Sequence, residues 1–261
     1  MIFLKLGGSL ITDKDRPSSA RGDVIQRAAK EIAAARATDL QVLLGHGSGS
    51  FGHFPAKQHG TREGVRAPEQ WRGFVEVWRQ AAALNRIVMD ALHAAGLPAL
   101  AFPPSASTLA QDGHVASWEL QPILAGIAAG LVPVVYGDVA FDLARGGTIL
   151  STEDLFVHLA AALKPTRILL AGDEEGVLAN YGKHPQIIPE ISPASYSQIA
   201  DSISGPAAPD VTGGMAGKVQ TMLELVKQLP ACEVRIFSGL EPGNIEKAIS
   251  GVALGTRLHA G

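Results

Sequence analysis

Short runs of apolar residues alternate along this chain with longer segments in which apolar residues recur every three or four positions. The longer segments are typical of helices that bury one side. The short runs are typical of strands, and they cover residues 2–6, 41–45, 99–102, 132–136, 167–171 and 234–237. This alternation predicts an α/β protein, a three-layer αβα sandwich with a mostly parallel central sheet covered by helices on both faces.

The apolar spacing also predicts the helices and their ends. The first helix should begin near Asp23 as its N-cap. The other predicted helices cover residues 69–95, 119–129, 153–163 and 216–229. Gly96 and Pro98 end the longest of them. Residues 190–210, rich in Ser, Pro and Ala, are the nearest approach to a domain boundary, or else a surface excursion, so we expect a single domain.

Composition and charge narrow the classes of function. The chain has 261 residues and a formal net charge of −3, and its Lys and Arg residues are scattered, so a nucleic-acid-binding surface is not indicated. Cys232 is the single cysteine, which fits a reducing compartment. The N-terminus runs straight into an apolar strand, and no apolar run approaches the roughly 20 residues of a membrane span. We expect a cytoplasmic protein with a small-molecule partner, no nucleic-acid partner and no membrane association.

Two glycines follow the first predicted strand, in the segment Lys5-Leu6-Gly7-Gly8-Ser9. Adjacent glycines let backbone N–H groups turn toward an anion, and a lysine supplies positive charge. A tight β-turn beside a solvated lysine explains the pair equally well. Neither the Walker spacing nor Gly-x-Gly-x-x-Gly follows the strand, so a P-loop NTPase and a dinucleotide-binding fold are not supported.

A second glycine cluster follows the second strand and reads Gly45-His46-Gly47-Ser48-Gly49-Ser50-Phe51-Gly52-His53. Four glycines within eight residues cost chain entropy unless the backbone takes up positive φ or approaches something closely. The preceding strand places them at the carboxyl end of the sheet, where ligands bind in open α/β folds. A histidine alone is more often structural, but the glycines around His53 favour a binding role.

A third glycine cluster, Asp210-Val211-Thr212-Gly213-Gly214-Met215-Ala216-Gly217-Lys218, leads directly into the last predicted helix. Lys218 lies in the first turn, where a cation opposes the helix dipole by a few tenths to about 1 kcal/mol. A phosphate bound at that helix terminus would attract both the lysine and the helix dipole. A lysine that points into water is the alternative interpretation.

These three clusters, in this order, resemble the amino-acid-kinase superfamily, whose members include acetylglutamate, carbamate, aspartate and uridylate kinases. Within it, the chain is similar to the isopentenyl phosphate kinases at segments 10–14, 49–53, 136–139 and 149–154. The narrower likeness rests mainly on Lys14 and on the Ser-Phe-Gly-His ending, which fosfomycin kinases share in part. The resemblance implies the amino-acid-kinase fold, with an acceptor-binding lobe at about 1–160 and an ATP-binding lobe at about 161–261, and a homodimer.

The resemblance also implies a reaction and assigns residues to it. ATP, as its Mg2+ complex, would phosphorylate isopentenyl phosphate, a step of isoprenoid biosynthesis by an alternative mevalonate route. Lys5 and Lys218 would hold the β- and γ-phosphates, Lys14 would stabilise the transferring group, and His53 would bind the acceptor phosphate. The further ATP contacts implied are Gly7, Gly8, Ser9, Ser48, Asp173, Gly176 and Gly214. The further acceptor contacts implied are Gly47, Ser48, Gly52 and Thr152. No general base is needed, because a phosphate monoester is already ionised near neutral pH.

Two positions depart from the family pattern. Ser48 stands where the family usually has glycine. Glu153 stands where the superfamily often has an aspartate that organises the catalytic lysines, and the adjacent Asp154 could serve instead. An ordinary helix start, with Thr152 as N-cap and carboxylates in the first turn, explains the acidic pair as well.

Two other functions compete with this one. The first is a kinase of the same fold with another acceptor, such as fosfomycin, a carboxylate or a carbamate. The second is a module that binds nucleotide without catalysis, although the joint presence of Lys5, Lys14, His53 and Lys218 argues against it. The helix over 69–95 offers walls for an apolar acceptor, but apolar residues at helical spacing are more often core. These residues are Phe74, Val77, Trp78, Ala81 and Leu84.

Overall fold

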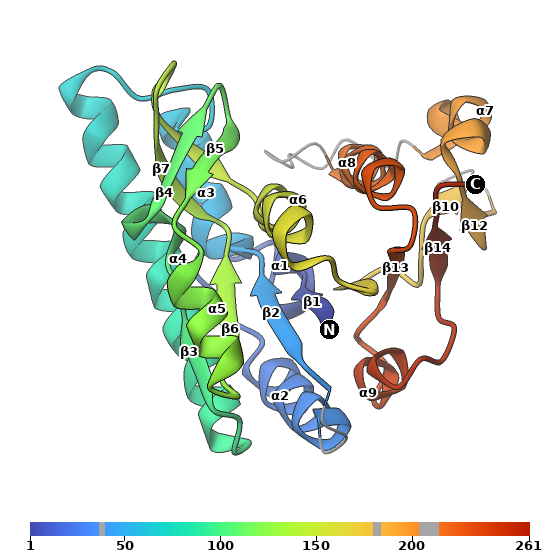
Figure 1. Ribbon diagram of the computed structural model, residues 1–261. Helices are drawn as coiled ribbons and strands as arrows, with labels where there is room; N and C mark the ends of the chain where they lie inside the picture. The colour runs from blue at the N-terminus through green and yellow to red at the C-terminus, as the bar shows by residue number, and fades with distance from the viewer. Residues whose placement is uncertain (37–39, 180–183, 204–213) are drawn as a thin grey trace.

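The computed structural model describes residues 1–36, 40–179, 184–203 and 214–261 (Figure 1). Within these ranges its main feature is an eight-stranded sheet of order β12-β14-β13-β9-β1-β2-β6-β3. These strands are β1 (Ile2–Leu6), β2 (Val42–His46), β3 (Ala99–Ala101), β6 (Val132–Tyr136), β9 (Arg167–Gly172), β12 (Glu190–Ile191), β13 (Glu233–Ser238) and β14 (Thr256–Leu258). Only the β13–β14 pair of this sheet is antiparallel. The predicted mostly parallel sheet is confirmed.

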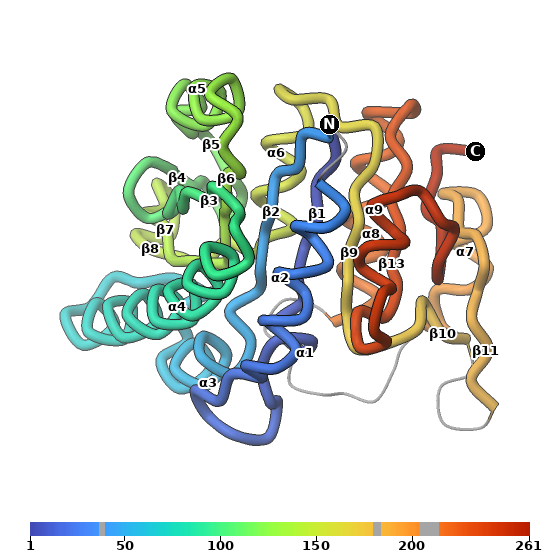
Figure 2. Tube along the Cα trace, turned by 90° about the horizontal axis from the view of Figure 1, so that it is seen from below, coloured from blue at the N-terminus to red at the C-terminus, as the bar shows by residue number. Residues whose placement is uncertain are grey.

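Helices cover both faces of this sheet, as Figure 2 shows with α2 and α9 in front of it and α6 and α8 behind. One face carries α2 (Gly22–Arg36), α4 (Pro68–Ala94) and α9 (Asn244–Ile249). The other face carries α5 (Gln121–Ala128), α6 (Thr152–Leu163), α7 (Pro193–Ile203) and α8 (Gly214–Gln228). Along β1, Ile2 and Leu4 enter the first core while Phe3 enters the second. Burial on both faces explains why the strands read as continuous apolar runs.

A second sheet, of order β5-β4-β7-β8, was not predicted. Its strands are β4 (Thr108–Gln111), β5 (His114–Trp118), β7 (Asp138–Asp142) and β8 (Gly146–Leu150). The sheet packs beside α4 and the unpredicted helix α3 (Gly49–His59), around what we call the third cluster. The third cluster consists of Ala56, Val65, Phe74, Val77, Val139 and Ile149. Helix α3 was not predicted because its glycines and Pro55 have low helix propensity, so its sequence is typical of a loop.

The remaining elements are short. They are α1 (Gly8–Ile11), η1 (Pro104–Ala106), β10 (Leu178–Ala179) and β11 (Gln186–Ile187). The described part of residues 190–210 forms β12 and α7, which pack on the main body and are not a linker, while residues 204–210 lie outside the described residues. No helix in the described part of the chain is both long and apolar enough to cross a membrane.

The predicted helices are found with small shifts at their ends. The helix expected over 69–95 is α4, which begins one residue earlier, at Pro68. Asp23 was predicted as an N-cap, but α2 already begins at Gly22, so Asp23 lies in its first turn instead. There its carboxylate is still favoured by the helix dipole.

Candidate active site

The glycine clusters after β1 and β2 lie in direct contact. A Cβ atom on Gly8 would lie 2.6 Å from the backbone of Gly49, and one on Gly47 would lie 2.8 Å from the nitrogen of Gly8. Neither position therefore has room for a side chain. Because β1 and β2 are parallel neighbours, this contact brings the starts of α1 and α3 together at the carboxyl end of the sheet.

The backbone donors of this region are only partly available to a ligand. The N–H of Gly47 donates to Leu6 O at 3.0 Å, and the N–H of Gly52 donates to Ser48 O at 3.2 Å inside α3. The predicted acceptor cradle of Gly47, Ser48 and Gly52 therefore keeps only the Ser48 N–H in this conformation. Helix α3, which the sequence did not predict, is the reason for the Gly52 bond.

In the first glycine cluster, too, some backbone N–H groups are already hydrogen-bonded and others are free. Gly7 donates its N–H to Ala171 O at 2.7 Å, which ties the cluster to β9. Among the described residues, no hydrogen bond engages the N–H groups of Gly8, Ser9 or Ser48. These three donors lie on the two segments that meet, so they are free to bind phosphate oxygens.

Lys5 points toward the sheet face that carries α6 and α8, because side chains alternate along β1. Its Nζ forms a buried, hydrogen-bonded ion pair with Glu153 Oε2 in the first turn of α6. Burial would raise the pKa of Glu153, but the charges of Lys5 and Lys218 offset this and hold that pKa below its ordinary value. Glu153 is thus an ionised carboxylate between two of the predicted lysines.

Asp154 caps helix α6, so Glu153 is the one of the two carboxylates that pairs with the lysines. The N-cap of α6 is Ser151 and not the predicted Thr152: Ser151 Oγ accepts from Asp154 N at 3.1 Å, and Asp154 Oδ2 accepts from Ser151 N at 2.8 Å. This reciprocal pair is a capping box. Thr152 is buried and its hydroxyl donates to His46 O at 2.7 Å, so it ties α6 to β2 and does not present that hydrogen to a ligand.

Asp173, just beyond β9, joins the first glycine cluster to Lys14, which follows α1. Its Oδ2 lies 2.8 Å from Lys14 Nζ, and its Oδ1 accepts from Ser9 Oγ at 2.6 Å. Burial would raise the pKa of Asp173, but the bonds to Lys14 and Ser9 hold it below its ordinary value. Gly176 lies further on, where a Cβ would come within 2.8 Å of Thr256 Oγ1. Asp173 thus unites residues that the sequence assigned separately to ATP and to the transferring group.

The two histidines of the second cluster differ in surroundings. His53 is half-buried in the first half of α3. His46 is buried, and its ring stacks on Tyr136 with centroids 5.3 Å apart. Its Nδ1 lies 3.1 Å from Gly47 O and its Nε2 lies 3.2 Å from Asn85 Oδ1. Burial lowers the pKa of His46, so a neutral ring fixes the backbone of this loop.

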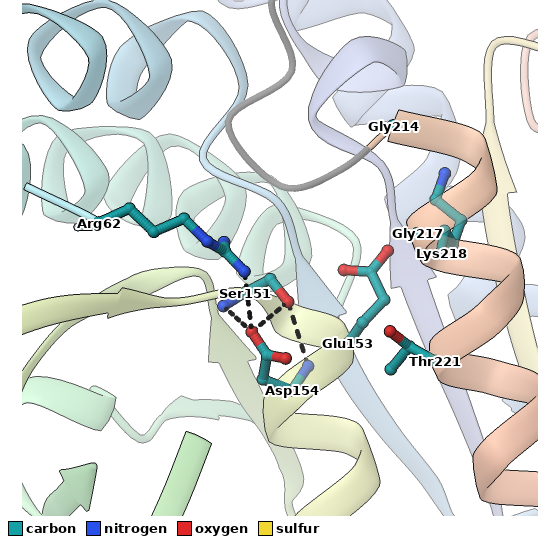
Figure 3. A pocket seen from close by; sticks show the side chains of 8 residues that line it. All are labelled: Arg62, Ser151, Glu153, Asp154, Gly214, Gly217, Lys218 and Thr221. Atoms are coloured by element: carbon teal, nitrogen blue, oxygen red, sulfur yellow. Dashed lines mark hydrogen bonds and ion pairs between the residues drawn. The ribbon is translucent and has the colours of Figure 1, made fainter. Parts of the chain in front are cut away.

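A small cavity of about 40 Å3 lies where α6 and α8 begin (Figure 3). It is lined by Arg62, Ser151, Glu153, Asp154, Gly214, Gly217, Lys218 and Thr221. Gly214 and Lys218 were predicted to contact ATP, whereas residues 210–213 of the third glycine cluster lie outside the described residues. Arg62 was missed, because a single arginine between α3 and α4 belongs to no motif and reaches the cavity only through the fold.

Known proteins resemble the chain over its whole length. A family model described as the amino acid kinase family matches residues 1–238. The isopentenyl phosphate kinase of Methanothermobacter thermautotrophicus is 37% identical over 267 residues, covering 99% of this chain and 98% of that protein. The isopentenyl phosphate kinase of Methanocaldococcus jannaschii is 32% identical over 266 residues, covering 99% and 98%. An X-ray structure of an isopentenyl phosphate kinase superposes with a TM-score of 0.83 at 32% identity, covering 98% of this chain and 99% of that one.

Proposed function

Because the chain belongs to the amino acid kinase family, we propose that it transfers the γ-phosphoryl group of ATP to isopentenyl phosphate, giving isopentenyl diphosphate and ADP. The observation that carries this proposal is the contact of the two glycine clusters after β1 and β2. The first cluster contains Lys5 and Ser9, and Ser9 is bonded to Asp173, while the second cluster forms the start of the helix that carries His53. A phosphate donor and a phosphate acceptor bound to the two clusters would be adjacent.

The chemistry requires several cations. Two unit charges 4 Å apart repel by about 4 kcal/mol at an effective dielectric near 20, and both reacting groups carry more than one charge. We assign Lys5 and Lys218 to the β- and γ-phosphates and Lys14 to the transferring group. An acceptor oxygen forms the new bond to the γ-phosphorus while the bond to the β-phosphate oxygen breaks, and electrostatic stabilisation with positioning supplies the catalysis. The ionised carboxylate of Glu153 would keep Lys5 and Lys218 aligned.

The acceptor is assigned to the N-terminal part of the chain, about residues 1–160, and ATP mainly to the C-terminal part. His53 and Ser48 N–H would bind the acceptor phosphate. Ala56 follows His53 by three positions on α3 and therefore shares its face. Since Ala56 belongs to the third cluster, an acceptor phosphate at His53 would direct an alkyl chain toward that cluster.

The apolar residues of α4 that were predicted to contact the acceptor belong partly to the third cluster and partly to the core under the main sheet. Phe74 and Val77 belong to the third cluster, Leu84 belongs to the core under the main sheet, and Ala81 is also buried. Trp78 is 44% exposed and belongs to neither. Phe74 and Val77 are thus the α4 side chains that we propose contact the alkyl group of the acceptor.

We also propose that ATP enters as its Mg2+ complex. The carboxylates of Glu153 and Asp173 are paired with lysines, so phosphate oxygens and water would supply the oxygen ligands that Mg2+ prefers. A homodimer is supported by apolar side chains left exposed on the second sheet, where Leu109 and its strand partner Phe141 are 43% and 51% exposed. A cytoplasmic location is supported by the single, unpaired Cys232.

The proposal is tested with an acceptor panel. The purified protein is incubated with ATP, Mg2+ and, separately, isopentenyl, dimethylallyl and geranyl phosphates, fosfomycin and acetylglutamate. ADP release is followed by a coupled assay and the product by 31P NMR. We expect turnover with the isoprenoid monophosphates and a new diphosphate signal. Faster turnover of fosfomycin or acetylglutamate, or ATP binding with no turnover of any acceptor, would overturn the proposal.

A further inference from the structure

Arg62 lies on a well-anchored part of the connection between α3 and α4. Its carbonyl oxygen accepts from Thr148 Oγ1 at 3.0 Å and from Arg145 Nη1 at 3.2 Å. Three residues later, Val65 N donates to Arg145 O at 2.9 Å. These bonds fix the backbone to the β7–β8 hairpin, so the side chain of Arg62 projects from a rigid support.

The guanidinium of Arg62 is poorly satisfied within the protein. Its Nη2 lies 3.7 Å from Asp154 Oδ2, which is too long for a hydrogen bond. That oxygen already accepts from the backbone and the hydroxyl of Ser151. The Nη1 atom of Arg62 is buried and has no hydrogen-bond partner in the described part of the chain. A buried, charged donor without an acceptor is costly, which points to an acceptor supplied by a ligand.

The cavity in front of this guanidinium is built for an anion. Arg62 approaches from one side and Lys218 borders the other, with Glu153 and Asp154 between them (Figure 3). Lys5 offsets the charge of Glu153, and Asp154 is engaged as a helix cap. Counting these five side chains, three cations face two carboxylates, which leaves one net positive charge for a phosphoryl group.

We propose that Arg62 binds the phosphoryl group during its transfer, from the side opposite Lys218. Arginine presents its donors as a rigid fork that matches two phosphate oxygens, so Nη1 and Nη2 can bind together once Nη2 turns from Asp154. As the acceptor oxygen bonds to the phosphorus and ADP leaves, the guanidinium stabilises the charge on the transferring oxygens and keeps its own proton. This inference rests on the proposed phosphoryl transfer and adds a catalytic residue to it.

A purely structural role is the alternative, in which Arg62 only braces Asp154 and the start of α6. The two roles differ in what they change. A brace would alter the unfolding temperature and the binding of both substrates. A ligand of the transferring group would alter kcat with little change in ATP affinity, because its contact strengthens as charge develops.

The experiment compares Arg62→Gln, Arg62→Lys and Arg62→Ala with the control Arg66→Gln, which lies on the same segment. Arg66 donates to Ala144 O at 2.7 Å and does not line the cavity. We measure kcat, both KM values, ATP affinity by calorimetry, the unfolding temperature and recovery by added guanidinium chloride. For Arg62→Gln we expect kcat to fall about 100-fold with ATP affinity within about threefold. This is less than the roughly 10³- to 10⁵-fold that an arginine finger supplies in phosphoryl transfer, because the glutamine amide can still donate a hydrogen bond. Arg62→Lys should keep more activity, and guanidinium should raise the rate of Arg62→Ala alone.

The inference is overturned if kcat of Arg62→Gln lies within twofold of Arg66→Gln, or if the loss appears as weaker ATP binding with kcat unchanged. It is also overturned if Arg62→Lys and Arg62→Ala both lose folding cooperativity, since that marks a brace. Failure of the proposed acceptor is a separate result, because it appears in the wild-type protein. The comparison of Arg62 and Arg66 variants is then made with whichever acceptor the wild type phosphorylates.

Discussion

The Nζ atom of Lys14 lies 2.8 Å from Oδ2 of Asp173, across the gap between the segment after α1 and the end of β9. Because Oδ1 of Asp173 also accepts from Ser9, one carboxylate joins the first glycine cluster to Lys14. Lys14 itself is more than half exposed, so its ammonium group is held in place yet open to a ligand. Phosphate oxygens would compete with Asp173 for this lysine.

Replacing Lys14 by alanine should lower kcat about 100-fold while KM for ATP changes less than about threefold, because the contact strengthens in the transition state. Steady-state kinetics with ATP and the acceptor measure both values. The control is Lys30→Ala, an exposed lysine on α2. An unchanged kcat would remove Lys14 from the mechanism.

Replacing His53 by alanine should lower kcat/KM for the acceptor about 10- to 100-fold, since a charge-assisted hydrogen bond is worth roughly 1.5 to 3 kcal/mol. His53→Gln should keep more activity, because an amide can still donate. Nucleotide affinity by calorimetry and folding by circular dichroism serve as controls. If alanine leaves kcat/KM within twofold of wild type, His53 is structural.

Replacing Gly8 by alanine should abolish most activity, because the new Cβ would lie 2.6 Å from the Cα and nitrogen of Gly49 and would force the two glycine clusters apart. We expect kcat/KM to fall at least about 100-fold, from misplacement of the reacting groups. The matched control is Gly22→Ala, where a Cβ meets nothing within 4 Å. Equal activities of the two variants would show that the clusters tolerate separation.

The free energy of unfolding should depend on pH through the titration of Asp138, which is fully buried. Burial raises the pKa of this carboxyl to about 6, against the hydrogen bonds from Ser105 and Val139. The folded protein therefore binds a proton that the unfolded chain has already lost between about pH 4 and pH 6. The stabilising contribution of this proton is present below the unfolded pKa and is lost as pH rises through about 6.

Asp138→Asn removes this titration. The free energy of unfolding of the wild type, relative to that of Asp138→Asn, should fall by roughly 1–2 kcal/mol between pH 5 and pH 8. Urea denaturation of both proteins at the two pH values measures the difference. A difference independent of pH would mean that Asp138 is ionised throughout.

Hydrophobic periodicity alone determined the central layers of the fold. The strands β1 and β6 agree with their predicted bounds, and α4 differs from its prediction by one residue at each end. These elements are buried on a whole face or on both faces, so their pattern is local and strong. The second sheet was missed because β4 and β5 are partly exposed, while β7 has an aspartate at each end and β8 begins with two glycines, residues that are depleted in strands.

The sequence likewise predicted which segments carry the proposed site, since the glycine clusters and Lys5, Lys14 and Lys218 are readable in order along the chain. It left open whether Glu153 or Asp154 serves the lysines. Neighbouring positions on a helix point about 100° apart, and only the packing of α6 against β1 decides which carboxylate meets Lys5.

Contacts between distant segments were decided by the tertiary structure alone. Asp173 meets Lys14 because β9 lies beside β1 in the sheet, and Arg62 reaches the cavity of Lys218 because the β7–β8 hairpin holds its loop. The hydrogen bonds that occupy the Gly47 and Gly52 N–H groups likewise depend on the end of β1 and on helix α3. Sequence patterns report local burial and backbone freedom, whereas these pairings depend on strand order and helix docking, which bring together residues that no local pattern relates.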